Sequence, residues 1–264
     1  MDKKSLRSTG KRVIGFANQK GGVGKTVSTL SIGAGLALAG QRVLLIDGDP
    51  QGNLTLFFTS DKSSGFFDLL RGLTEGGFSQ IENYILPEVR ENLYLMPNCQ
   101  RELRSLIKDA QITSIAEAFI DHVRLLKSRF DWILLDCSPS NGALEKMLVS
   151  ACDAIVVPLE FQVFSITGLS GLLDEIKQWG GEIGREIPVE ALVFTKTEKR
   201  ISRMNEYREI FRNFRIPIFE VCKSEWLPKA VELGKTIWET APTSYSAEDY
   251  YRIVSQIFLG NENE

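Results

Sequence analysis

The chain has 264 residues, of which 43% are hydrophobic, and a formal net charge of −3. This length is sufficient for one large domain with a buried core. The net negative charge excludes a polycation that binds nucleic acid over its whole surface, so any such contact must come from a local basic patch. The four cysteines show no C-x-x-C spacing, which favours reduced thiols in a cytoplasmic protein.

Membrane association is not indicated by the hydropathy pattern. No apolar run approaches the roughly 18 residues of a membrane-spanning helix, and residues 1–12 are polar and basic without the apolar core of a signal peptide. We therefore expect a cytoplasmic protein with a single domain over residues 1–264. Residues 1–10 are expected to form a loose basic tail, and residues 260–264 a frayed acidic tail.

Apolar runs alternate with helical patterns along the whole chain. Strands are expected at residues 12–18, 41–47, 92–97, 131–136, 154–158, 188–194 and 216–222. Helices are expected at residues 24–39, 66–70, within 100–129, and at 163–179, 203–214 and 247–258, with a loop at 72–77. The alternation predicts an α/β fold, with a doubly wound, mostly parallel β-sheet flanked by helices.

A glycine-rich stretch, NQKGGVGKT at residues 18–26, joins the first expected strand to the first expected helix. Glycines let backbone N–H groups surround an anion, and the helix directs the positive end of its dipole at the same place. Lys25 can reach a β- or γ-phosphate, and the Thr26 hydroxyl can bind Mg²⁺. The general P-loop pattern has glycine where this chain has Gln19, so the variant K-G-G-x-G-K-[ST] fits instead, with an additional Lys20.

Carboxylates follow two of the expected buried strands. Asp47 and Asp49 lie just past the strand at residues 41–47, and Asp136 ends the strand at 131–136. Ligands bind at the carboxyl ends of strands in open α/β sheets. Four hydrophobic residues followed by aspartate is the Walker B arrangement, whose carboxylate holds Mg²⁺ through water. The alternative for Asp47 and Asp49 is an ordinary Asp-Pro turn.

These motifs together resemble the ParA-type ATPases of the ParA/MinD superfamily, which have a deviant Walker A motif. The resemblance rests on KGGVGKT at 20–26, DGDPQGN at 47–53 and the strand ending in Asp136, and it extends to residues 155–169, 233–237 and 241–243. It covers roughly residues 11–258. No added helix-turn-helix domain precedes it, so the chain resembles the short form of the family.

The resemblance implies an ATP- and Mg²⁺-dependent switch that forms a homodimer with ATP between the subunits. Lys20 would reach the partner's ATP, as an arginine finger does, and Asp49 would orient the attacking water. The implied catalytic residues are Lys20, Lys25 and Asp49. The implied ATP-binding residues are Lys20, Gly21, Gly22, Val23, Gly24, Lys25, Thr26 and Val27. The implied Mg²⁺ ligands are Thr26, Asp47 and Asp136. The chain departs from the family pattern at Val27, Ser138 and Glu160.

Two binding partners are expected, DNA and an adaptor protein. Residues 196–215 carry seven basic residues and three glutamates, a net charge of +4, which favours non-specific DNA binding over a merely solvated helix face. The candidate DNA-binding residues are Lys199, Arg200, Arg203, Lys223, Lys229 and Lys235. The family resemblance adds a ParB-like adaptor with a basic N-terminal peptide, and a nucleoid-associated location.

Three other functions remain open at this stage. A MinD-like ATPase acting at a membrane needs a basic amphipathic C-terminal helix, and this C-terminus is acidic. A nitrogenase-type iron protein needs paired cluster cysteines in glycine-rich loops, a setting that Cys99 and Cys137 lack. A nucleotide-binding scaffold without DNA binding or turnover is disfavoured by the intact Lys20, Lys25 and Asp49.

Overall fold

The computed structural model describes residues 12–59, 64–77, 80–98, 109–139, 142–160, 165–198, 209, 211 and 214–260. An eight-stranded sheet with the order β3-β4-β2-β5-β1-β6-β7-β8 runs through this part of the chain. The strands are β1 (Arg12–Phe16), β2 (Val43–Asp47), β3 (Leu86–Arg90), β4 (Leu93–Met96), β5 (Trp132–Asp136), β6 (Ala154–Glu160), β7 (Val189–Thr197) and β8 (Ile218–Cys222). The edge strand β3 runs antiparallel to β4, whereas the other recorded pairings are parallel. The predicted fold class is confirmed.

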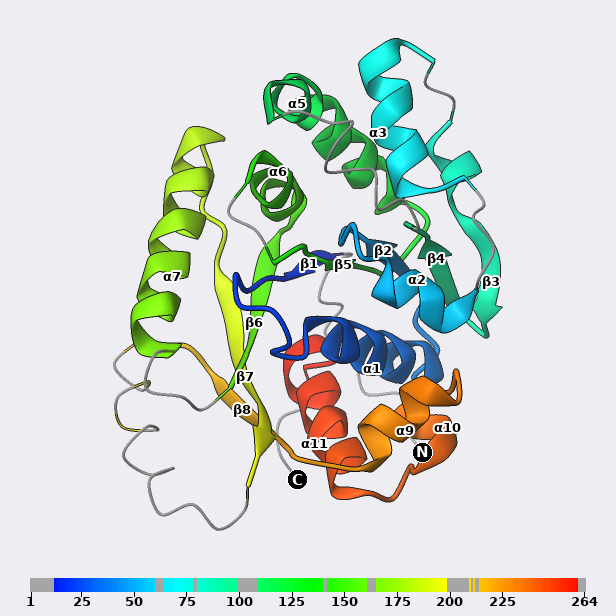
Figure 1. Ribbon diagram of the computed structural model, residues 1–264, viewed down its shortest axis with the longest axis vertical. Helices are drawn as coiled ribbons and strands as arrows, with labels where there is room; N and C mark the ends of the chain where they lie inside the picture. The colour runs from blue at the N-terminus through cyan, green and yellow to red at the C-terminus, as the bar shows by residue number, and fades with distance from the viewer. Residues whose placement is uncertain are drawn as a thin grey trace.

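Helices cover both faces of the sheet (Figure 1). One face carries α1 (Lys25–Leu38), α11 (Tyr245–Ile253) and the π-helical turn η2 (Val254–Phe258), with α9 (Trp226–Glu232) and α10 (Ile237–Thr240) beside them. The other face carries α3 (Phe66–Glu75), α5 (Asp109–Leu126), α6 (Ala143–Ala151) and α7 (Ser165–Glu182). Two short elements, α2 (Asn53–Phe58) and the 3₁₀ turn η1 (Ile81–Tyr84), lie in the β2–β3 connection.

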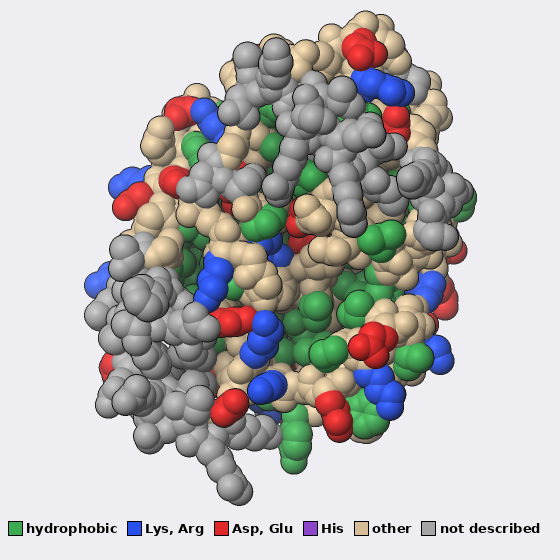
Figure 2. Space-filling view, in the orientation of Figure 1, with side chains coloured by type: hydrophobic (Ala, Val, Ile, Leu, Met, Phe, Trp, Pro, Cys, Tyr) green, Lys and Arg blue, Asp and Glu red, His purple; other side chains and the backbone are tan. Residues whose placement is uncertain are grey.

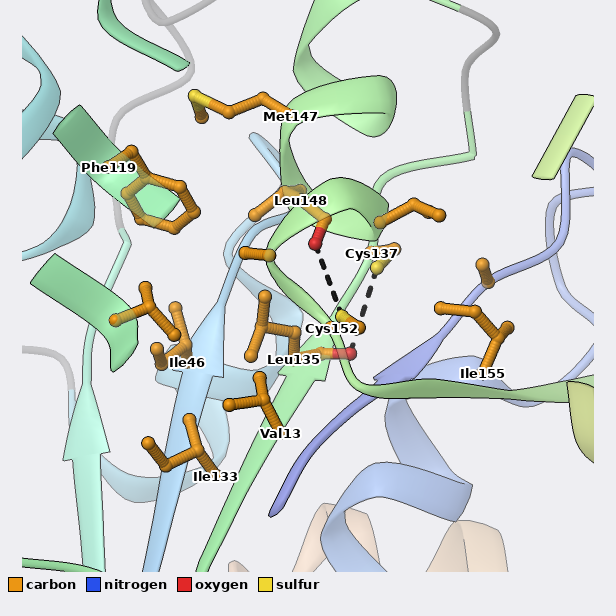
Figure 3. Packing of buried hydrophobic residues seen from close by; sticks show 14 of the residues in the cluster. Val13, Ile46, Phe119, Ile133, Leu135, Cys137, Met147, Leu148, Cys152 and Ile155 are labelled. Atoms are coloured by element: carbon orange, nitrogen blue, oxygen red, sulfur yellow. Dashed lines mark hydrogen bonds between the residues drawn. The ribbon is translucent and has the colours of Figure 1, made fainter. Parts of the chain in front are cut away.

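The central strands are apolar throughout because both of their faces are buried. Successive side chains alternate between two cores, since the side-chain period of a strand is two. Val13 belongs to the core under α5 and α6, whereas its neighbour Ile14 belongs to the core under α1. Figure 3 shows part of the first core, where side chains from β1, β2, β5 and β6 pack together with Phe119 of α5 and Met147 of α6.

The thiols of the described cysteines lie in or near these cores. Cys137, Cys152 and Cys222 are buried, and none of them forms a disulfide bond with another described cysteine. The Cys152 thiol donates to the Leu148 carbonyl at 3.1 Å, and the Cys137 thiol to the Leu135 carbonyl at 3.8 Å (Figure 3). Burial raises the pKa of the Cys137 and Cys152 thiols, so they remain protonated at neutral pH.

Most predicted elements are confirmed, with two corrections. The loop expected at residues 72–77 is wrong, because α3 continues to Glu75. Leu73 packs against the core below α3, and this burial outweighs the low helix propensity of Gly72. Five helices and strands of the described residues were not expected at all, namely α2, β3, α6, α9 and α10, and neither was the short turn η1. The helix expected at 203–214 and the tail at 1–10 lie outside the described residues, except for residues 209, 211 and 214.

Candidate nucleotide site

The glycine loop lies between the end of β1 and the start of α1, at the centre of the sheet. Gly22 and Gly24 have φ angles of 77° and 89°, a region that side chains with a Cβ rarely enter. A Cβ at Gly24 would also lie 3.2 Å from Thr195 Cγ2. Asn18 shapes the start of the loop, because its Oδ1 accepts from the Lys20 backbone N–H at 2.9 Å and its Nδ2 donates to the Pro158 carbonyl at 2.7 Å.

Lys25 begins α1 and points back into the loop. Its ammonium donates to the Asn18 carbonyl at 2.8 Å and to the Lys20 carbonyl at 3.3 Å, and the side chain is buried. Burial lowers the pKa of Lys25, while the charges of Asp136 and Asp49 oppose that shift. The loop therefore holds one buried positive charge, with carboxylates around it.

Thr26 and Asp136 meet at the mouth of the same loop. The Thr26 hydroxyl donates to Asp136 Oδ2 at 2.6 Å, whereas the buried Oδ1 of Asp136 has no hydrogen-bond partner in the described structure. Burial raises the pKa of Asp136 to about 7, and the hydrogen bond from Thr26 opposes this shift. A hydroxyl beside a carboxylate with an unsatisfied oxygen is a donor set that suits Mg²⁺.

Asp47 lies next to Asp136, because the two residues are register partners in β2 and β5. Its Oδ2 accepts from the Thr55 backbone N–H at 2.8 Å and from the Thr55 hydroxyl at 2.6 Å, and its Oδ1 accepts from the Asp49 N–H at 3.2 Å. Burial raises the pKa of Asp47 well above its usual range. The side chain thus braces the turn that carries Asp49, and its place in a Mg²⁺ shell stays a prediction.

Asp49 is buried at the edge of the cleft, and hydrogen bonds fix both its backbone carbonyl and its side-chain carboxylate. Its carbonyl accepts from Asn98 Nδ2 at 3.2 Å, and its Oδ1 accepts from the Gln51 N–H at 2.9 Å. Asn98 also donates its backbone N–H to the Thr55 hydroxyl at 2.6 Å. We did not predict Asn98 from the sequence, although it follows β4 at the same carboxyl edge of the sheet as the aspartates.

A cleft of about 590 Å³ runs along the loop. Its lining includes Asp49 and six of the predicted ATP-binding residues. These six are Gly21, Gly22, Gly24, Lys25, Thr26 and Val27. The lining also includes the apolar side chains of Leu30, Leu56, Phe57 and Val231, and Figure 2 shows hydrophobic side chains gathered on this face. A cleft that combines a phosphate-binding loop with apolar side chains suits a nucleotide.

Two predicted ATP-binding residues do not line this cleft. The Val23 side chain is buried, so only its backbone is available to the loop. Lys20 is exposed and lines a second pocket of about 300 Å³ on the other side of the loop, together with Glu160 and Leu172. The loop therefore separates its two lysines onto different sides.

The predicted DNA-binding residues fall into two groups. Lys199, Arg200 and Arg203 lie outside the described residues. Lys223, Lys229 and Lys235 are exposed near β8 and α9. The Lys223 ammonium lies 3.8 Å from a Glu198 carboxylate oxygen, and the Lys229 ammonium lies 4.9 Å from the centroid of the Trp226 ring. DNA contact by these lysines stays a prediction.

The fold and this site define the class of protein: a P-loop nucleotide-binding protein with a doubly wound sheet. A family model described as "AAA domain" matches residues 11–188. The Soj protein of Bacillus subtilis, described as a sporulation initiation inhibitor, is 28% identical over 93% of this chain and 98% of its own. The chromosome-partitioning ATPase Soj of Thermus thermophilus is 29% identical over 93% and 95%.

Among solved structures, the ATP complex of a substituted form of Cyanothece McdA superposes with a TM-score of 0.79 at 19% identity, over 96% of this chain and 98% of that one. The chain belongs to the AAA domain family and is a ParA-type ATPase of the ParA/MinD superfamily. No helix among the described residues is both long and apolar enough to cross a membrane.

Proposed function

We propose that this ParA-type ATPase is an ATP-dependent dimerising switch that binds DNA non-specifically and partitions a plasmid, a chromosome or another cargo. The observation that carries this proposal is the cleft in which Lys25, Thr26 and Asp49 converge on one glycine loop, with Asp136 behind Thr26. Relatives of similar length include a chromosome-partitioning ATPase, which supports the partition role.

The donor set of the cleft fits Mg²⁺ bound jointly with nucleotide. No group of three acidic, histidine or cysteine side chains in the described residues could hold a metal alone. Mg²⁺ is commonly held by one or two protein ligands plus phosphate oxygens and water. Thr26 and Asp136 would hold the ion, with Asp47 next to Asp136. When bound, Mg²⁺ would neutralise charge on the phosphate oxygens.

In this proposal Lys25 and Asp49 have separate roles, one toward the phosphates and one toward the attacking water. Lys25 supplies a positive charge inside the loop, where burial makes it electrostatically effective. Asp49 orients water at the edge of the cleft, and the hydrogen bonds from Gln51 and Asn98 fix its position. Because Asp49 is already held in place, the site needs little reorganisation when this side chain orients the water.

Lys20 is proposed to act on the ATP of a second subunit. The side chain is exposed and lies on the side of the loop away from the cleft that Lys25 lines. This arrangement supports a role in trans, in which a homodimer places ATP between its subunits. A ParB-like adaptor with a basic N-terminal peptide would stimulate hydrolysis.

The alternative MinD-like role at a membrane needs an amphipathic C-terminal helix that is available to lipid. Here the closing segment, α11 with η2, buries Tyr250, Ile253, Val254 and Phe258 in the core shared with α1. These apolar side chains are used within the domain. The described part of the C-terminus therefore favours the DNA-binding switch.

Steady-state ATP turnover, measured with and without random-sequence duplex DNA, tests the proposed function. We expect slow, Mg²⁺-dependent turnover that DNA stimulates, and ATP-dependent DNA binding that weakens steeply with salt. Absence of turnover under both conditions would instead support the nucleotide-binding scaffold. DNA binding without a requirement for ATP would contradict the switch.

A further inference from the structure

The end of β7 contacts the glycine loop through two side chains, neither of which lines the cleft. The Lys196 ammonium donates to the Gly22 carbonyl at 2.9 Å and to Glu160 Oε1 at 2.5 Å. The Thr195 hydroxyl lies 2.9 Å from the Val23 carbonyl oxygen and 3.4 Å from that of Leu159. Two consecutive side chains of one strand thus contact two consecutive carbonyls of the loop.

These contacts have a consequence for the N–H groups on the other side of each peptide. A peptide unit is planar and trans, so its C=O and N–H point in opposite directions. The Gly22 carbonyl shares a peptide with the Val23 N–H, and the Val23 carbonyl shares one with the Gly24 N–H. Fixing both carbonyls against β7 therefore turns both N–H groups the opposite way, as an anion-binding loop requires.

The backbone at Lys196 indicates that its position matters. Lys196 has a φ of 54°, a left-handed conformation that residues with a Cβ rarely adopt. The register between β7 and β8 shifts between Phe194 and Thr197, the stretch that contains Lys196. Glu160 is the register partner of Thr195 in β6, so the carboxylate that pairs with Lys196 is fixed by the sheet.

We propose that Lys196, held by Glu160, is a positioning residue of the phosphate loop, which together with Thr195 presents the Val23 and Gly24 N–H groups to bound phosphate. This inference rests on the proposed nucleotide binding. It gives Glu160, a departure from the family pattern, a role within this chain: its charge holds the lysine at the loop. The competing explanation is a surface ion pair with no effect on nucleotide.

The test measures the affinity of a fluorescent ADP analogue with Mg²⁺, and the KM and kcat for ATP. For Lys196→Met we expect the dissociation constant and KM to rise about threefold to tenfold, the range for a partly exposed charge-assisted hydrogen bond. The kcat should change much less, because preorganised binding is lost equally from ground and transition states. Lys196→Arg should retain affinity, and Thr195→Val should weaken it.

The Lys196→Gly variant separates the effect of losing the ammonium group from the effect of the left-handed backbone. Glycine adopts a φ of 54° without strain, so this variant should melt no lower than the wild type and still bind the analogue more weakly. Lys146→Met is the matched control, because Lys146 forms an ion pair with Glu182 on the α6–α7 surface away from the loop. It should bind the analogue as the wild type does.

The outcomes distinguish this inference from the proposed function. If the wild type does not bind the analogue, the proposed function is wrong. If the wild type binds and Lys196→Met binds equally well, the positioning role is wrong. Weak binding by Lys196→Met with normal binding by Lys196→Gly would also overturn it, since the backbone rather than the ammonium would then be responsible.

Discussion

The Thr26 hydroxyl donates a 2.6 Å hydrogen bond to Asp136, across a separation of 110 positions in the sequence. The sheet creates this contact, because β1 and β5 are adjacent parallel strands in which Phe16 and Asp136 are register partners. The loop after β1 and the carboxylate that ends β5 therefore meet at one edge. This pair joins the two motifs into the single site at which we propose that Mg²⁺ and phosphate bind.

Asp136→Asn should weaken the apparent affinity for Mg²⁺ about 10- to 100-fold, the usual cost of altering a residue that tunes a metal site. The amide keeps the size of the side chain but removes the charge that a cation needs. ATP turnover measured against Mg²⁺ concentration gives the shift. Asp131→Asn is the control, because Asp131 lies just before the opposite end of β5. An unchanged Mg²⁺ profile for Asp136→Asn would remove Asp136 from the metal site.

Strands and site residues could be predicted from the sequence where a local run of apolar residues coincides with a strand that is buried on both faces. β1, β2 and β5 are apolar runs buried on both faces, and the glycine loop and the terminal aspartates follow them at fixed positions. By contrast, β3 is an edge strand with half-exposed side chains, so it lacks such a run. The helix α2 has only six residues and exposes Leu56, which leaves too little amphipathic pattern to recognise.

The residues that position the site could not be found from local pattern. Asn98 is one amide in a loop, and only the pairing of β4 with β2 brings it to Asp49. Lys196 reads as one of several basic residues, and its contact with Gly22 depends on the β6–β7 pairing and a left-handed backbone. The roles of Asn98 and Lys196 depend on which strands are neighbours in the sheet, and a single sequence does not reveal that strand order.

A mixing experiment tests whether Lys20 acts in trans. Lys20→Ala and Asp49→Ala should each be nearly inactive alone. If Lys20 reaches the partner's ATP, a mixed dimer contains one complete site, with Asp49 from one chain and Lys20 from the other. An equimolar mixture should then recover about a quarter of the wild-type ATP turnover, since half of the dimers are mixed and each has one active site of two.

The same variants report on dimerisation. Asp49→Ala should accumulate as an ATP-bound dimer, measured by light scattering during gel filtration, because hydrolysis would no longer release the subunits. Asp121→Ala, an exposed position on α5, should behave as the wild type does. No recovery of turnover in the mixture would indicate that Lys20 acts within its own chain. A monomeric Asp49→Ala protein in ATP would contradict the sandwich dimer.

We expect Glu145 to make the free energy of unfolding depend on pH. It is fully buried in α6 with neither carboxylate oxygen hydrogen-bonded in the described structure. Burial raises its pKa from 4.5 to about 8, opposed by the charge of Lys25. Between these two pH values the unfolded chain has released the proton and the folded chain retains it. The free energy of unfolding therefore falls as pH rises through this range, and the loss is complete above the folded pKa.

Glu145→Gln should flatten this dependence, because glutamine stays neutral at every pH. Urea unfolding at about pH 5 and about pH 8 should show a smaller loss of stability in the variant, by an amount on the order of a few kcal/mol, since each pKa unit corresponds to about 1.4 kcal/mol. Glu117→Gln, at an exposed position of α5, is the control. Equal pH dependence in Glu145→Gln and the wild type would show that Glu145 is charged in the folded protein.

The three described basic candidates near α9 give the test of DNA binding. A triple variant, Lys223→Ala with Lys229→Ala and Lys235→Ala, should bind random duplex DNA more weakly in the presence of ATP. The slope of log affinity against log salt should also decrease, by about 0.9 for each lysine–phosphate ion pair that the substitutions remove. A second triple variant, Arg124→Ala with Lys146→Ala and Arg252→Ala, removes the same charge elsewhere on the surface. Equal losses of affinity in both variants would indicate an effect of net charge alone, and unchanged affinity in the first would exclude these lysines from the DNA interface.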